Sequence, residues 1–309
     1  MSSAPEVTIS SQKAKFNEDG WFREESVCWP GQAMSLKVKN VLLEKQTKFQ
    51  HLTVFENDGP WGRVMTLDGA IQLTEKDEFV YHECMSHVPL FAHPNPKNVL
   101  IIGGGDGGVM REVLKHESVE KCDLVDIDGD VIEESKKLFP SVAVSFSHPK
   151  ANAVVGDGLA WVQEAKSESY DIIIVDSSDP EGPASSLFGT DFYKNVYRVL
   201  RPGGIVCSQG ESMWLHSDLI HKMLTMLKSK EVGFADSKYG LIYIPTYPCG
   251  SIGSLMGVKA FEDGTVLDVR KPLRAFDPRI QKELKYYNPG MHSSAFQLPQ
   301  FAAAKFGQF

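Results

Sequence analysis

The sequence predicts an α/β protein with a mostly parallel sheet, preceded by a small antiparallel β domain. Two observations predict the parallel sheet: short apolar runs without alternation, and amphipathic stretches of helical character between them. A third predicts the smaller domain, because the pattern from Trp21 to Thr74 is that of strands. The expected domains are residues 1–75, built from strands, and residues 76–309, which carry the parallel sheet.

Composition and charge limit the possible classes of protein. The chain has 309 residues, of which 42% are hydrophobic and 23% charged, as is typical of globular proteins. No run of about 18 apolar residues occurs and the N-terminus lacks an apolar stretch, so we expect neither a membrane span nor a secretory signal. The net charge of −8 disfavours nucleic acid and anionic membranes as partners, and is compatible with a cationic ligand.

The cysteines and histidines give no sign of a metal site or a disulfide framework. The cysteines are odd in number and include no CxxC pair, which predicts reduced thiols in the cytoplasm. The histidines show no HExxH pattern, and no GxSxG elbow of a serine hydrolase occurs. The cysteines are Cys28, Cys84, Cys122, Cys207 and Cys249.

The N-terminal segment alternates apolar and polar residues, partly in MSLKVKNVLLEKQ and more clearly in HLTVFEN and GRVMTLDGAIQL. Such alternation is typical of strands that bury one face. Asp68-Gly69 separates two runs, and an Asp-Gly pair favours a type I′ hairpin turn, in which both central residues have positive φ. The segment is therefore predicted to form an antiparallel sheet.

A helix is predicted from Glu75 to His93, because acids at its start suit the helix dipole and the prolines after His93 end it. The apolar runs NVLIIGG, KCDLVDI, ANAVVGD, YDIIIVD and GGIVCSQG then alternate with VMREVLKH, DVIEESKKLF, LAWVQEAKS and DFYKNVYRVL. LHSDLIHKMLTMLKSK adds a helix, and YGLIYIPTYP and SIGSLMGVKAF are expected to close the sheet. Ligands of such folds bind at the carboxyl ends of the strands, where this chain has acidic residues.

The first turn after a parallel strand is rich in glycine and contains a carboxylate. Gly103, Gly105 and Gly108 match GxGxxG between a strand and a helix, a context that alone indicates a dinucleotide site. Asp106 inside the turn would repel a pyrophosphate and attract an ammonium or a sulfonium. We therefore expect a ligand with an adenosyl part and no phosphate, with a merely structural glycine turn as the alternative.

Acidic residues also end the next two strands. Asp126 lies where an acid typically binds ribose hydroxyls, which either NAD or an S-adenosyl compound would satisfy. Asp128 could cap the following helix instead. Asp157 could accept a hydrogen bond from the adenine amine, with Gly158 allowing close approach, or it could cap the next helix.

The fourth parallel strand ends in the strongest signal, the pair Asp176 and Asp179. Two carboxylates on one loop repel each other unless a cation lies between them. A hard metal ion is possible, but no third ligand has suitable spacing, so an amine substrate is expected. Tyr81, Tyr247 and Trp29 could wall an aliphatic diamine, since a ring face attracts an ammonium; each could equally be a core residue.

Several long motifs together resemble the spermidine synthase family, from about residue 21 to residue 301. They are GGGDGG with VMREVLKH, VGDG, DSSDPEGPASSLF, QGESMWLH, IPTYPCGSIG and LKYYN. The resemblance implies a methyltransferase-like Rossmann core with a mostly parallel seven-stranded sheet, a small N-terminal antiparallel β domain, and usually a homodimer. It also implies direct transfer of the aminopropyl group of decarboxylated S-adenosylmethionine to putrescine, giving spermidine and methylthioadenosine, with no metal and no permanently bound cofactor.

The resemblance further implies roles for individual residues. Asp176 would take a proton from the attacking amine, and Asp106 would bind the amine of the aminopropyl arm. The residues that would bind putrescine are Tyr81, Asp179 and Tyr247, with Trp29, Gln209 and Glu211 nearby. The residues that would bind the co-substrate are Gln50, His82, Gly104, Asp106, Asp126, Ile127, Asp157 and Gly158.

The chain departs from the family pattern at His82, where Gln is usual, and at Asp126, where Glu is usual. His82 could still hydrogen-bond the co-substrate, with a role that depends on pH. A putrescine N-methyltransferase that uses S-adenosylmethionine would share the same core, although Asp106 should repel the carboxylate of that compound. The motifs are also compatible with a nucleoside-binding regulatory protein without turnover, and with the same chemistry on a longer acceptor.

Overall fold

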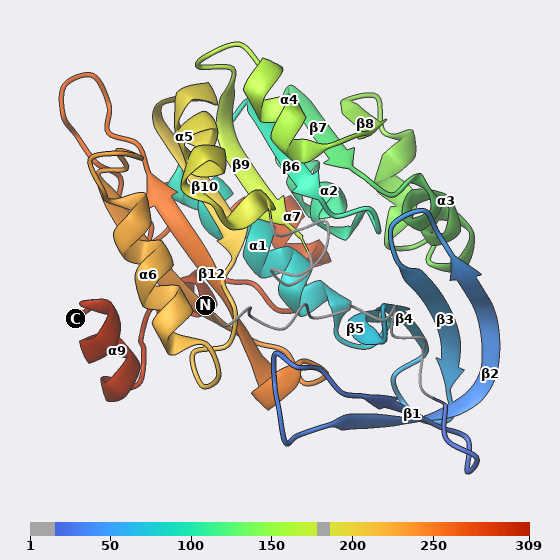
Figure 1. The fold of residues 1–309 in the computed structure, drawn as a ribbon. Helices are drawn as coiled ribbons and strands as arrows, with labels where there is room; N and C mark the ends of the chain where they lie inside the picture. Colours follow the sequence, from blue (N-terminus) through green and yellow to red (C-terminus); the bar gives the residue numbers. More distant parts are fainter. Residues whose placement is uncertain (1–15, 178–185) are drawn as a thin grey trace, which may run out of the picture. The chain divides into compact units, whose positions relative to one another are not determined.

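The computed structural model describes residues 16–177 and 186–309 of the chain. The chain divides into two compact units, Met1–Glu75 and Lys76–Phe309. The first unit consists of strands, and the second alternates strands with helices (Figure 1). Within the described ranges, no helix is both long and apolar enough to cross a membrane.

The N-terminal unit holds one five-stranded antiparallel sheet, in the spatial order β1-β2-β3-β4-β5. Its strands are β1 (Trp21–Glu24), β2 (Met34–Gln46), β3 (His51–Asn57), β4 (Arg63–Leu67) and β5 (Ala70–Thr74). Asp68 and Gly69 join β4 to β5 with φ values of 49° and 81°, so the predicted turn with two positive φ values is confirmed. The apolar side chains of the sheet pack around the buried Phe22 and Phe55.

The larger unit is built on a seven-stranded sheet in the order β11-β12-β10-β9-β6-β7-β8. Strands β6 to β10 run parallel, and β11 and β12 are antiparallel to their neighbours, which confirms the predicted mostly parallel sheet. The strands are β6 (Asn98–Gly103), β7 (Lys121–Asp126), β8 (Ala151–Val155), β9 (Tyr170–Asp176), β10 (Leu200–Gln209), β11 (Asp236–Tyr243) and β12 (Ser251–Val258).

Helices connect and cover these strands. Those before β10 are α1 (Glu78–Ala92), α2 (Gly108–Val113), α3 (Gly129–Leu138), the 3-10 helix η1 (Ala143–Ser147), α4 (Gly158–Glu164) and α5 (Thr190–Val199). Those after it are α6 (Ser217–Leu227), the 3-10 turn η3 (Pro248–Gly250), α7 (Pro278–Glu283), α8 (Pro289–Ser294) and α9 (Gln300–Phe306). Helix α1 begins at Glu78 rather than at the predicted Glu75, because β5 continues to Thr74 and the chain turns before the helix.

The parallel strands are apolar throughout because both faces of the sheet are covered. Along β6, Val99 and Ile101 point into a core shared with α1 and α2, whereas Leu100 and Ile102 point into a second core shared with α4, α5 and α6. The helices accordingly lie in two layers, on opposite faces of the sheet (Figure 1). This arrangement explains the absence of alternation in the sequence of these strands.

The strand order reverses at β6. From β6 the chain proceeds to β7 and β8 on one side, and then returns to place β9 on the other side. Ligands of open α/β sheets bind at the carboxyl ends of the strands at such a switch point. The turn from β6 to α2 and the residues that end β7 and β9 therefore form the candidate site.

Candidate active site

The glycine-rich turn after β6 packs directly against two of the carboxylates. A Cβ on Gly104 would lie 2.9 Å from Oδ2 of Asp176, and a Cβ on Gly105 would lie 2.8 Å from Oδ2 of Asp126. Asp106 is the next residue of the same turn. The glycines thus allow three carboxylates, from three segments of the chain, to gather at the switch point.

Asp176 ends β9 and is held from α1. The Tyr81 hydroxyl donates a hydrogen bond of 2.7 Å to its Oδ1, whereas its Oδ2 is buried and has no hydrogen-bond partner within the described residues. Burial and the neighbouring Asp106 raise the pKa of Asp176 to about 7, against the opposing effects of His82 and Tyr81. A carboxyl group that titrates near neutrality is suited to accept a proton from a bound substrate.

Asp126 is tied to the backbone of the turn. It accepts hydrogen bonds from the backbone N–H groups of Gly105 at 2.9 Å and Asp128 at 2.8 Å. Burial raises its pKa to about 6 in spite of these bonds. Asp128 is the N-cap of α3, so the capping role beside Asp126 is filled by its neighbour.

Asp157 and Gly158 have structural roles of their own. Asp157 is exposed and caps α4, accepting from the backbone N–H of Leu159 at 2.8 Å. A Cβ on Gly158 would lie 2.3 Å from the side chain of Ile102, so the glycine is required where α4 meets β6. The capping alternative is therefore present at Asp157, and its binding role stays a prediction together with those of Gly158 and Ile127.

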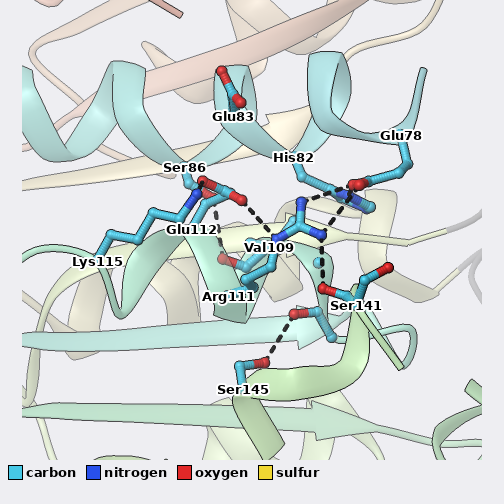
Figure 2. Close-up of polar contacts among 12 residues, drawn as sticks. Glu78, His82, Glu83, Ser86, Val109, Arg111, Glu112, Lys115, Ser141 and Ser145 are labelled. Atoms are coloured by element: carbon cyan, nitrogen blue, oxygen red, sulfur yellow. Dashed lines mark hydrogen bonds and ion pairs between the residues drawn. The ribbon is translucent and has the colours of Figure 1, made fainter. Parts of the chain in front are cut away.

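His82 connects the glycine turn to α1. It is 2% exposed, and its Nε2 lies 3.4 Å from Oδ1 of Asp106 while its Nδ1 lies 2.6 Å from Oε2 of Glu78. Burial alone would lower the pKa of His82, but the two carboxylates raise it to about 10. Arg111 donates to both oxygens of Glu78, at 3.1 and 2.8 Å, as Figure 2 shows.

The segment that carries Tyr247 is anchored to the start of α1. Asp77 accepts from the backbone N–H of Thr246 at 3.1 Å and from its hydroxyl at 2.7 Å. The rings of Tyr247 and Tyr81 lie 6.0 Å apart between centroids. The structure therefore brings Tyr247, Tyr81 and Asp176 into one group, and the role of the two rings as a wall for a diamine stays a prediction.

Gln209 and Glu211 lie at and just after the end of β10, on the other side of β9. Both are buried, and Oε1 of each lacks a hydrogen-bond partner in the described part of the chain. Glu211 has a φ of 55°, unusual for a residue with a side chain, and its Oε2 lies 3.0 Å from Nδ1 of His216. Buried polar atoms held in strained backbone are typical of binding sites.

Three predicted residues are not placed in this group. Gln50 and Trp29 belong to the N-terminal unit, where Gln50 lies between β2 and β3 and Trp29 is buried. Asp179 lies outside the described residues. Within residues 16–177 and 186–309, no group of three potential ligands could hold a metal ion.

Comparison with known proteins identifies the family. The spermine/spermidine synthase domain model matches residues 78–264, and the spermidine synthase tetramerisation domain model matches residues 20–75. The chain belongs to the spermidine synthase family. Spermidine synthase of Schizosaccharomyces pombe is 48% identical over 92% of this chain and 93% of its own, and that of Dictyostelium discoideum is 46% identical over 93% and 98%.

Solved structures of spermidine synthases have the same fold. A spermidine synthase crystallised with the transition state analogue AdoDATO superimposes with a TM-score of 0.84 at 35% identity, covering 98% of this chain and 99% of that one. The enzyme from Thermotoga maritima superimposes with a TM-score of 0.82 at 34% identity, with the same coverage. The family resemblance, the Rossmann-like core and the assignment as an aminopropyltransferase enzyme are thus confirmed.

The sequence did not reveal the residues that hold the site's side chains in place through hydrogen bonds and ion pairs. Glu78 and His82 are four residues apart on α1, a spacing at which helical side chains meet, so this pair could have been found. Arg111 and Thr246 lie far from their partners along the chain, and no local pattern announces them.

Proposed function

We propose that the carboxylates at the switch point are where this member of the spermidine synthase family transfers an aminopropyl group to putrescine. The group comes from decarboxylated S-adenosylmethionine, and the products are spermidine and methylthioadenosine. One observation carries the proposal: Asp106, Asp126 and Asp176 converge on one turn, which suits positively charged reactants and disfavours a pyrophosphate.

Asp176 is the proposed base. Putrescine is a dication in water, with an amine pKa of ~10.4, and an ammonium has no lone pair with which to attack. Bringing that pKa down to ~7.5 costs about 4 kcal/mol, toward which burial and the nearby sulfonium both contribute. Bound cations also lower the pKa of Asp176 from about 7, so its buried Oδ2 is ionised when the amine arrives.

The displacement of the thioether by the amine depends on the alignment of the two reactants and needs no covalent intermediate. The deprotonated amine attacks the carbon next to sulfur, the carbon–sulfur bond breaks, and the neutral thioether leaves with the bonding electrons. The proton of the attacking nitrogen passes to Asp176. Holding both reactants in line supplies much of the acceleration, because it replaces a chance encounter by a fixed geometry.

The diamine lies along the aromatic pair in this proposal. Tyr81 and Tyr247 flank its methylene chain, and the buried Oε1 atoms of Gln209 and Glu211 receive its far ammonium. Asp179 and Trp29 are assigned to the same substrate from the family motif.

The co-substrate occupies the other side of the turn. Asp106 binds the amine of its aminopropyl arm, and Asp126 binds the ribose through lone pairs that its backbone hydrogen bonds leave unused. The remaining co-substrate residues are assigned from the family motif, and they are Gln50, His82, Gly104, Ile127, Asp157 and Gly158. No permanently bound cofactor is needed.

A two-donor product assay tests the function. The protein is incubated with putrescine and either decarboxylated S-adenosylmethionine or S-adenosylmethionine, and the products are identified by mass. We expect spermidine with the first donor and no N-methylputrescine with the second. Methyl transfer as the only activity would support the methyltransferase alternative, and parallel reactions with cadaverine and spermidine define the acceptor range.

An oligomer in the cytoplasm completes the proposal. The N-terminal unit matches a model named for tetramerisation, which supports an oligomer, while the sequence resemblance favours a homodimer. Light scattering after size-exclusion chromatography distinguishes a dimer from a tetramer, and cell fractionation tests the location. Nucleic acid and membranes are not expected as partners.

A further inference from the structure

A buried cation faces the carboxylate cluster of the candidate site. The cluster consists of Asp106, which lies in the glycine turn, and of Asp126 and Asp176, which border it. Nε2 of His82 lies 3.4 Å from Asp106, and the charge of His82 also acts on Asp176. A Cβ on Gly108 would lie 2.2 Å from the imidazole ring, so the start of α2 presses directly on it.

His82 is itself held by a chain of alternating charges between α1 and α2 (Figure 2). Its Nδ1 contacts Glu78 at 2.6 Å, and the guanidinium of Arg111 grips both oxygens of Glu78. Nε of Arg111 then donates to Glu112 at 2.7 Å, and Lys115 lies 2.6 Å from the second oxygen of Glu112. This order favours an ionised Glu78 paired with the imidazolium, because the charge of Glu78 is matched from both sides.

We propose that His82 is a permanent imidazolium that serves as counter-ion to the carboxylate cluster, and that Glu78, fixed by Arg111, is the positioning residue that keeps His82 charged. The inference rests on the proposed function for its catalytic consequence. It goes further by attributing the ionisation of the base Asp176 to the charge of a histidine and to the glutamate behind it.

The charged groups around His82 and Asp176 determine whether the pKa of Asp176 rises or falls when His82 loses its charge. Glu78 and Asp106 face His82, and the ring of Tyr81 lies beside it. Asp176 faces Tyr81, Asp106, Asp126 and His82, and Cys207 also lies within its field. Among these neighbours of Asp176, His82 is the cation. Removing its charge must therefore raise the pKa of Asp176, so that Asp176 ionises at a higher pH.

The pKa directions agree with the geometry. Burial would raise the pKa of Glu78, but His82 and Arg111 lower it to about 2, while the pKa of His82 rises to about 10. Both partners of the pair are therefore charged throughout the neutral range.

A kinetic test compares pH profiles of kcat/KM for putrescine. In His82→Gln we expect the acid limb to move up by about 0.5 to 1 pH unit, because Asp176 loses the positive charge that favours its ionised form. The amine of putrescine titrates identically in every variant, so a difference between profiles reports the protein. Acid limbs that coincide would overturn the proposal.

Glu83→Gln is the matched control. Glu83 is the next residue of α1 after His82, is 1% exposed, and points to the other side of the helix (Figure 2). It accepts backbone hydrogen bonds from Lys285, Tyr286 and Tyr287 at 2.7 to 2.9 Å. This variant places the same amide at similar burial, and its acid limb should stay where the wild-type limb is.

A titration without substrate tests the role of Glu78. The imidazole signal of His82, assigned by its loss in His82→Gln, is followed by NMR. We expect it to remain that of an imidazolium up to about pH 9 in the wild type, and its midpoint to fall by about one unit or more in Glu78→Gln. A neutral His82 at pH 8, or an unmoved midpoint, would contradict the proposal.

Two further points distinguish failure of the His82 proposal from misfolding of a variant and from failure of the proposed function. If Glu78→Gln does not fold, Arg111→Lys, which keeps the charge and loses the two-pronged contact, should lower the midpoint by a smaller amount. If the protein makes no spermidine, the proposed function fails, whereas the NMR titration still decides whether His82 is a permanent cation.

Discussion

Replacing the proposed base should lower turnover and stabilise the folded protein at the same time. In Asp176→Asn the amide oxygen can still accept the hydrogen bond from Tyr81, so the local geometry is kept. The amide cannot take a proton from the substrate, and we expect turnover to fall by about 10² to 10⁴-fold, the usual contribution of a general base. Binding of methylthioadenosine should change little.

The magnitude of the stability gain follows from the pKa of Asp176. A rise from 3.8 to about 7 means that the folded protein binds this proton more tightly than the unfolded chain does. Stability is therefore lost as pH rises from 3.8 through 7, by up to about 4 kcal/mol at 1.36 kcal/mol per unit. Because Asp176 is only partly buried, we expect about half of this, or a Tm increase of roughly 4 to 8 °C at pH 8.5.

Differential scanning calorimetry at pH 5 and pH 8.5 tests this reasoning. The stability difference between Asp176→Asn and the wild type should be larger at the higher pH, where the wild-type carboxylate is ionised in the folded state. A variant that is less stable than the wild type at pH 8.5, or a difference independent of pH, would refute the argument that Asp176 is ionised at a cost.

The remaining predictions concern residues around the site and the core. Asp77→Ala removes both hydrogen bonds to Thr246 and should raise KM for putrescine by about tenfold, with a smaller effect on the co-substrate, as steady-state kinetics would show. Cys249→Gly should raise the free energy of unfolding by about 1 kcal/mol, since Cys249 has a φ of 59°; urea denaturation measures this, and a loss of stability would contradict it. Burial lowers the pKa of His93 and His292 to about 4, so acid denaturation curves should show stability lost between pH 6.5 and 4, and less so in His292→Gln.

The main strands and helices could be predicted because each is long enough to leave a clear pattern of apolar residues in the sequence. Residues 99–102 are apolar without interruption, and the two cores on either side of β6 explain why. The helices α7, α8 and α9 were not predicted, since six or seven residues hold fewer than two full turns and give no clear period. Whether these three segments form helices depends on their packing against the rest of the fold.

The candidate site was predictable where it lies at strand ends and not where it depends on support from other elements. Asp176 and Asp126 could be placed because parallel strands deliver their last residues to one edge. Sequence alone could not decide between capping and binding at Asp157, because both roles use an acid before a helix. The pairing of Arg111 with Glu78 spans 33 residues and depends on how α1 packs against α2.

The three backbone hydrogen bonds to Glu83 bear on how the protein is made in the cell. They join α1, near the start of the larger unit, to donors about 200 residues later in the chain. Until Tyr287 has left the ribosome, α1 can bury its carboxylate only at the cost of an unpaired charge. The larger unit therefore completes its core only after residues 285–287 have been translated, and truncation before residue 285 should yield an insoluble product.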